Sequence, residues 1–209
     1  MRRVSIPVAV TAVMITTAAQ MMSTAHSASA ESLRAPGVPP TAPPHLKFED
    51  STLPPMAHTV FCLRYRDECR ARMLFRGGPI QLTETRWADL KEVNQTINGT
   101  IIPDPTELGL AMESWLIEPK RGDCNDYAVS KRHGLLSRGW PQRTLLLAEV
   151  VTVWGKHHLV LLVRTRSGDL VLDNLTAVIR PWSRAPYRWV RTQSPESARY
   201  WQTVAKRGV

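Results

Sequence analysis

The chain has 209 residues, of which 43% are hydrophobic, and its 27 Lys and Arg against 18 Asp and Glu give a formal charge of +9. This length and apolar content suffice for a buried core, which excludes wholesale disorder. The arginines are scattered along the chain rather than clustered, so the positive charge is not typical of a nucleic-acid-binding protein and we expect no nucleic acid partner.

The first thirty residues have the pattern of a secretory signal peptide. Arg2 and Arg3 give a positively charged start, residues 4–19 are small and apolar, and Ala28 and Ala30 form an A-x-A cleavage site. The sequence therefore predicts a periplasmic or secreted protein with no stable membrane insertion after cleavage of residues 1–30. In such a compartment, cysteine pairs become disulfides.

Residues 31–57 are rich in proline and have almost no apolar periodicity, which predicts an extended tether. We expect the folded domain to span residues 58–209. Within it, residues 83–97 carry apolar side chains three or four positions apart, which is typical of a helix with one buried face. A second helix is expected over residues 125–136, with Gly139 as its C-cap.

The second half of the chain changes to a strand pattern. Segments rich in Leu and Val, separated by Gly-containing turns, predict antiparallel strands. The expected strands are residues 145–153, 159–164, 170–175 and 187–192. Helices followed by strands indicate an α+β fold, with a helical layer packed on an antiparallel sheet.

Three cysteines suggest two different roles. Cys62 and Cys69 are separated by six residues that include a polar set suited to a turn, so we expect them to form a disulfide in an exported protein. This pairing leaves Cys124 at the beginning of the second expected helix. The positive end of the helix dipole lowers the pKa of a thiol in that position, so Cys124 is a candidate nucleophile.

A thiol nucleophile also needs a base and a group that orients the base. His157 and His158 lie at the start of an expected strand, on opposite faces, and the pattern alone does not choose between them. Asp173 lies in an apolar strand, where an ionised carboxylate needs a partner, so it is the candidate orienting acid. Asp169 follows a Ser-Gly turn and is expected to be solvated.

Three motifs in this order resemble the bacterial transglutaminase-like cysteine peptidases. They are GDCNDYA at residues 122–128, HHLVLLV at residues 157–163 and GDLVLDNL at residues 168–175. The resemblance implies a papain-like or transglutaminase-like core with a Cys-His-Asp triad, exported to the periplasm. The family pattern falls on Cys124, His158 and Asp173.

The same resemblance brings in calcium. Some members of this family bind calcium through carboxylates that flank the cysteine, and Asp123 and Asp126 match those positions, whereas Asn125 stands where the motif commonly has an acid. The chemistry itself requires no cofactor.

The leading hypothesis is a thiol hydrolase that cleaves amide bonds of an envelope or secreted protein through an acyl-enzyme. Its partner is then a protein substrate in the periplasm or at the cell surface. One alternative is acyl transfer to an amine, which cross-links proteins with the same three residues. The other is an exported binding module that keeps the fold without turnover.

Overall fold

The computed structural model describes residues 45–70, 78–104 and 114–205, all of which belong to one compact unit spanning residues 40–209. The expected signal peptide, residues 1–30, and residues 31–44 of the expected tether lie outside the described residues. No helix in the described ranges combines the length and apolar character needed to cross a membrane.

The centre of the fold is an antiparallel sheet with the strand order β1-β9-β8-β4-β5-β6-β7. Its strands are β1 (Phe48–Thr52), β4 (Leu145–Val151), β5 (His157–Thr165), β6 (Gly168–Leu172), β7 (Arg180–Pro181), β8 (Arg188–Gln193) and β9 (Trp201–Val204). The central strands β4, β5 and β6 form a meander of hairpins. This arrangement confirms the α+β prediction and the antiparallel sheet.

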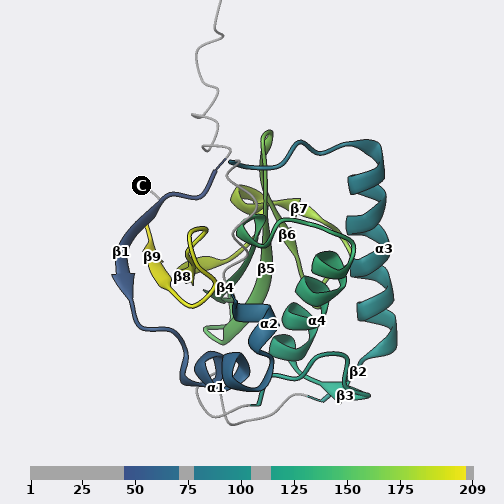
Figure 1. Cartoon of the computed structure of the whole chain (residues 1–209), viewed down its shortest axis with the longest axis horizontal. Coiled ribbons are helices and arrows are strands. Elements are labelled where there is room, and N and C mark those ends of the chain that lie inside the picture. The colour runs from purple at the N-terminus through teal and green to yellow at the C-terminus, as the bar shows by residue number, and fades with distance from the viewer. Residues whose placement is uncertain (1–44, 71–77, 105–113, 206–209) are drawn as a thin grey trace, which may run out of the picture. The chain divides into compact units, whose positions relative to one another are not determined.

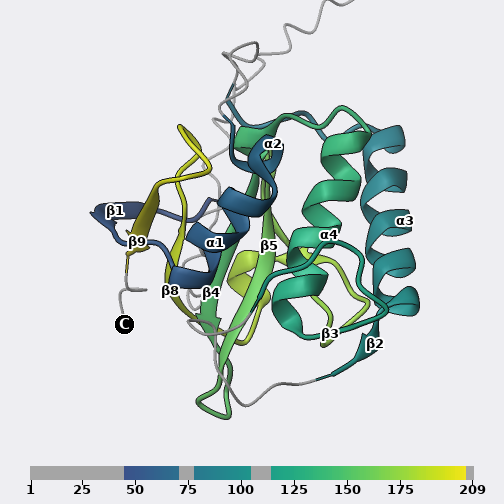
Figure 2. The same cartoon turned by 60° about the horizontal axis from the view of Figure 1, so that its bottom comes forward.

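Helices cover one face of this sheet, as Figures 1 and 2 show. They are α1 (Met56–Arg64), α2 (Arg66–Cys69), α3 (Glu84–Thr100) and α4 (Cys124–Ser137), with the short 3-10 turns η1 (Gln142–Thr144) and η2 (Trp182–Arg184) elsewhere. Helix α4 packs against β5, and α3 packs against α4. The short strands β2 (Ile102–Pro103) and β3 (Arg121–Gly122) form a separate parallel pair before α4.

The alternation predicted for β5 divides the core into two clusters. Leu159, Leu161 and Val163 belong to the cluster that includes residues of the helices, whereas Val160 and Leu162 belong to a second cluster. All seven residues of β4 are buried. Because the central strands are buried on both faces, their sequences read as nearly continuous apolar runs.

The two predicted helices are confirmed as α3 and α4. Helix α3 begins after Thr83, whose side chain accepts a hydrogen bond from the backbone of Arg86. Helix α4 is followed by Gly139, which has a φ of 81° and donates its N–H to Leu136 at 3.0 Å. The positive φ favours glycine at this position, which explains why the chain leaves the helix there.

The domain begins earlier than expected. Within the range predicted as a tether, residues 48–52 form β1, which pairs with β9, and α1 begins at Met56. The backbone N–H of Leu46 donates to Asp169 at 2.8 Å, and Asp169 is fully buried rather than solvated as predicted. The early start of the domain could not be predicted from the sequence, because β1 has only one partner strand and three exposed residues and therefore carries little apolar pattern.

Candidate active site

The start of α4 positions Cys124 as the first residue of the helix. Asp123 is the N-cap, and its side chain accepts the backbone N–H of Asn125 at 2.9 Å. The side chain of Asp126 in turn accepts the backbone N–H of Asp123 at 3.1 Å, which completes a capping box. Cys124 is half-buried, and the helix N-terminus places it where the peptide dipoles favour a negative charge.

Gly122 is required by this cap. A Cβ atom at residue 122 would lie 2.4 Å from Oδ2 of Asp126, which is closer than two such atoms can approach. The capping box therefore closes only when residue 122 has no side chain. The geometry of the cap thus explains the glycine of the GDC sequence, which the residue types alone did not explain.

The carboxylate of Asp126 is held inside the protein. It is 6% exposed, and its Oδ1 atom also accepts the backbone N–H of Leu116 at 2.7 Å. Burial, together with the negative charge of Asp123, raises the pKa of Asp126 to about 6, although the two backbone hydrogen bonds oppose this change. Two acidic groups therefore lie on either side of Cys124 and repel each other when both are ionised.

His158 and Asp173 form a buried pair. Nε2 of His158 lies 2.8 Å from Oδ1 of Asp173, and their side chains are 6% and 2% exposed. Burial alone would raise the pKa of Asp173, but hydrogen bonds from His158, Tyr187 and the backbone of Leu175, together with the charge of His158, hold it below its usual value. The carboxylate of Asp173 is therefore ionised at neutral pH.

His157 has different surroundings. Its side chain is 56% exposed, and its Nδ1 atom lies 2.6 Å from Oε1 of Glu149, which also pairs with Arg191. The two adjacent histidines, which the sequence pattern alone left equivalent, are thus distinct in the structure. His158 lies against the candidate orienting acid, and His157 belongs to an ion-pair cluster at the surface.

Cys124 and His158 belong to elements that begin at the same end of the sheet. In both Figure 1 and Figure 2, the first turn of α4 and the first residues of β5 lie toward one end, beside β3 and the β4–β5 hairpin. Hydrogen bonds tie the surrounding elements together at this end. Tyr127 of α4 donates to the backbone oxygen of Ile101 at 2.6 Å, and the side-chain amide of Asn98 donates to the backbone oxygen of Asp173 at 3.0 Å.

Two neighbours of Asp173 were not found from the sequence. The hydroxyl group of Tyr187 donates a hydrogen bond to Oδ2 of Asp173, and Lys131 of α4 interacts with the charge of Asp173. Lys131 is 1% exposed, and burial lowers its pKa to about 7, although Asp173 opposes this change. Lys131 lies seven positions after Cys124 on the predicted helix, and this spacing could have indicated Lys131 from the sequence. No feature of the sequence indicated that Tyr187 contacts Asp173.

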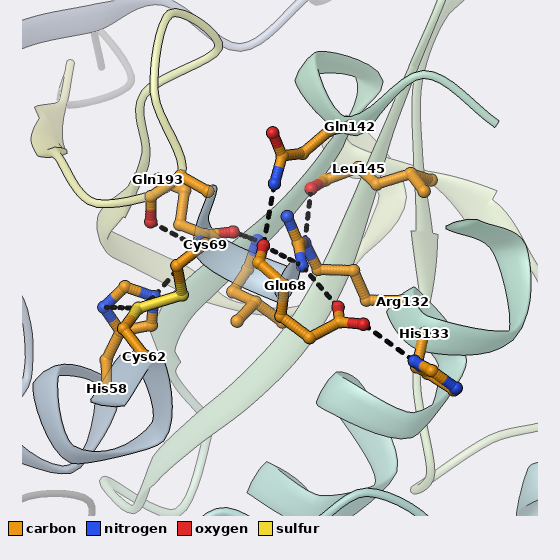
Figure 3. Close-up of polar contacts among 11 residues, drawn as sticks. His58, Cys62, Glu68, Cys69, Arg132, His133, Gln142, Leu145 and Gln193 are labelled. Carbon is orange, nitrogen blue, oxygen red and sulfur yellow. Dashed lines mark hydrogen bonds and ion pairs between the residues drawn. A yellow bond between two sulfur atoms is a disulfide. The ribbon is translucent and has the colours of Figure 1, made fainter. Parts of the chain in front are cut away.

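A polar cluster at the other end of α4 joins this helix to its neighbours, as Figure 3 shows. Nη1 of Arg132 lies 2.8 Å from Oε2 of Glu68, and both side chains are buried. Arg132 also donates to the backbone oxygen of Leu145, and His133 lies 2.7 Å from the second oxygen of Glu68. These contacts hold α2 against α4 and β4.

The expected disulfide joins Cys62 of α1 to Cys69 of α2. His58, Cys62 and Cys69 have potential metal-ligating atoms within 4.8 Å of one another, and they form the one such group of three in the described ranges. Because both sulfur atoms are bonded to each other, neither is a thiolate that could bind a metal.

One cavity in the described part of the domain, of about 170 Å³, is lined by Asp173 and Tyr187 together with residues of the β4–β5 hairpin and the segment after β6. A second cavity, of about 520 Å³, lies between the segment after α4 and the β8–β9 connection. The smaller of these two cavities therefore borders the His158–Asp173 pair, and the larger one is formed by other elements.

Comparison with known proteins gives a family match and several structural neighbours. The calcium-bound LapG of Legionella pneumophila is 26% identical with a TM-score of 0.46, and the alignment covers 51% of this chain and 64% of that one. The EGTA-treated form of the same protein is 22% identical with a TM-score of 0.49, covering 59% of this chain and 69% of that one. The chain thus spans about two thirds of the length of these structures. No curated protein sequence matches it.

The family match extends over nearly the whole described domain. The sequence profile of the bacterial transglutaminase-like cysteine proteinases matches residues 48–208, which include β1, the disulfide, the start of α4 and the last strand of the sheet. The chain belongs to the family of bacterial transglutaminase-like cysteine proteinases.

Proposed function

We propose that this protein is an exported cysteine peptidase that cleaves amide bonds of an envelope or secreted protein. Membership of the family supports the reaction class. The observation that carries the assignment to residues is the buried contact of 2.8 Å between His158 and Asp173, at the end of the sheet where Cys124 begins α4. Cys124 acts as the nucleophile, His158 as the base and then the acid, and Asp173 as the orienting group.

The contact between His158 and Asp173 defines the tautomer of the imidazole. Because the carboxylate of Asp173 only accepts hydrogen bonds, the Nε2 atom of His158 carries the proton and Nδ1 is the atom that can act as a base. In the proposed reaction, Nδ1 takes the proton of the Cys124 thiol. The resulting thiolate and imidazolium are stabilised by the helix N-terminus and by Asp173, respectively.

The reaction then proceeds in two stages. The sulfur of Cys124 attacks the carbonyl carbon of the substrate, and backbone N–H groups near the start of α4 stabilise the oxyanion. The imidazolium of His158 protonates the amine as the C–N bond breaks, which leaves an acyl-enzyme. Water, activated by Nδ1 of His158, attacks the thioester and releases the acid and the Cys124 thiol.

Export is part of the proposal. Residues 1–30 have the pattern of a signal peptide, and the Cys62–Cys69 disulfide is typical of a protein in an oxidising compartment. A periplasmic or secreted location places the enzyme with envelope and secreted proteins, which are its proposed substrates.

Calcium enters the proposal as a stabilising ligand of the first turn of α4. The carboxylates of Asp123 and Asp126 repel each other, and burial adds to the cost of ionising Asp126. A hard cation with oxygen ligands relieves both costs, so the acidic pair fits calcium. Bound calcium would supply positive charge beside Cys124, and the proton transfers would still be carried out by Cys124 and His158.

The experiment is a comparison of the wild type with Cys124→Ala, each incubated with periplasmic and surface proteins from cells that lack the enzyme. New N-termini are labelled and identified by mass spectrometry. We expect a defined set of new N-termini with the wild type and none with Cys124→Ala, because the variant has no nucleophile. The same set of N-termini from Cys124→Ala would overturn the proposal, and incorporation of a labelled amine without cleavage would identify acyl transfer instead.

A further inference from the structure

The carboxylate of Asp173 has two oxygen atoms with different partners. Oδ1 lies 2.8 Å from Nε2 of His158 and accepts the backbone N–H of Leu175 at 3.1 Å. Oδ2 accepts the hydroxyl group of Tyr187. A carboxylate held by donors on both oxygens cannot rotate without breaking a hydrogen bond in a buried site, which is costly.

Tyr187 reaches Asp173 from a different part of the sheet. It comes directly before β8, which lies on the far side of β4 from β5 in the strand order. Its ring packs against the core cluster that contains Val160 and Leu162, and its centroid lies 5.8 Å from that of His158. Tyr187 therefore contacts both members of the His158–Asp173 pair.

The phenol is a permanent donor in this position. Burial, followed by the hydrogen bond to Asp173 and the charge of Asp173, raises the pKa of Tyr187, whereas the charge of Arg180 opposes this change. The hydroxyl group is thus protonated throughout the neutral range. Besides His158, the buried Lys131 of α4 interacts with the charge of Asp173.

We propose that Tyr187 is a positioning residue of the active site, which fixes the carboxylate of Asp173 so that Oδ1 faces Nε2 of His158. It acts through Asp173 and does not touch the reacting atoms. By holding Oδ1 in place, it keeps the proton of the imidazole on Nε2 and leaves Nδ1 to accept the proton of Cys124. This inference rests on the proposed function, because it assigns the base to Nδ1 of His158.

The test uses the rate at which iodoacetamide alkylates Cys124 in the mature protein with its disulfide intact, measured in EGTA so that no metal at Asp123 or Asp126 contributes. Cys124 is the one cysteine outside the disulfide, so alkylation reports on its thiolate directly. Tyr187→Phe removes the hydroxyl group and keeps the ring. We expect the ratio of the alkylation rate at pH 6 to that at pH 9 to fall by up to about tenfold, because loss of a hydrogen bond to a charged group changes the equilibrium that forms the thiolate by about that factor.

The matched control is Tyr200→Phe, because Tyr200 is 68% exposed and forms backbone hydrogen bonds with Ser194 and Ser197, which the substitution keeps. Tyr200→Phe should keep the wild-type ratio. Site-specific replacement of Tyr187 by a fluorotyrosine, which keeps both ring and hydroxyl, should also keep a ratio close to that of the wild type. The fluorotyrosine variant gives a result even if Tyr187→Phe folds poorly.

The outcomes separate this inference from the proposed function. If the wild type itself shows no alkylation at pH 6 beyond that of an ordinary thiol, the proposed thiolate–imidazolium pair is wrong, and with it the role of Tyr187. If the wild type is alkylated rapidly at pH 6 and Tyr187→Phe has the same ratio, only the positioning role of Tyr187 is wrong. If Tyr187→Phe lowers only the melting temperature and keeps the alkylation ratio, Tyr187 is a packing residue and the positioning role is wrong.

Discussion

Two histidines of this protein are almost equally buried, yet their surroundings differ. His58 is 1% exposed and His158 is 4% exposed. The indole N–H of Trp201 donates to Nδ1 of His58 at 3.2 Å, and the side-chain amide nitrogen of Gln193 lies 3.0 Å from its Nε2 atom. His158 instead has the carboxylate of Asp173 on Nε2.

The partners decide what each ring can do. Burial, together with the charge of Arg132, lowers the pKa of His58 to about 3, so this ring is neutral at neutral pH. A protonated His158 has a carboxylate beside it. Burial by itself therefore does not make a histidine a candidate base. The acidic partner distinguishes the candidate active-site end of the domain from the end that holds the disulfide, which Figure 3 shows.

The largest test of this comparison removes the imidazole at the candidate active-site end. His158→Asn should lower the rate at which new N-termini appear by about 1,000-fold, because proton transfer to and from His158 is lost. The matched control is His157→Asn, whose side chain is 56% exposed and pairs with Glu149 rather than Asp173. A greater loss in His157→Asn than in His158→Asn would exchange the roles of the two residues.

The second test breaks the cluster at the other end of α4. Arg132→Met leaves Glu68 buried without its guanidinium, which should lower the free energy of unfolding by about 3–5 kcal/mol. The measurement is urea unfolding at pH 7, and the alkylation ratio of Cys124 should stay unchanged. Arg121→Gln is the control, because its ion pair with Asp104 is more than half exposed on both sides and should contribute less than about 1 kcal/mol. An equal loss in both variants would contradict the comparison.

The smallest expected effect concerns calcium. Calcium chloride, compared with EGTA, should raise the melting temperature at pH 7.5 by roughly 3 °C, as a ligand that binds only the folded state does. At pH 5 the response should shrink, because the pKa of Asp126 is about 6 and its carboxylate is then mostly protonated. Asp126→Asn should lose the response, and Asp104→Asn, at an exposed carboxylate, should keep it. A response that survives in Asp126→Asn would place calcium elsewhere.

Much of the architecture could be predicted because it depends on local patterns. The spacing of Leu90, Val93 and Ile97 predicted α3, and all three side chains are buried. The strands β4, β5, β6 and β8 were found from their composition. The edge strands β1 and β7 were missed, since an edge strand with exposed residues carries little apolar alternation. The last strand, β9, was missed as well.

The candidate site was predictable only in part. Cys124 followed from its place at a helix start, where Asp123 is a strong N-cap residue. Asp169 was expected in water, and it is buried, because the segment around Leu46 folds back over it. The residue types of a turn predict where the chain reverses, but they do not predict which other segment of the chain covers that turn.

The sequence by itself determined the helix that begins at Cys124, the alternation of β5 and the family to which the chain belongs, because each depends on residues that are close together in the chain. Tertiary structure decided which histidine lies against Asp173, and it brought Tyr187 to the other oxygen of that carboxylate. These contacts join β5, the end of β6 and the start of β8, whose order in the sheet is set by packing across the whole domain. Alternation along one strand gives two faces, and only the neighbouring strands determine what each face meets.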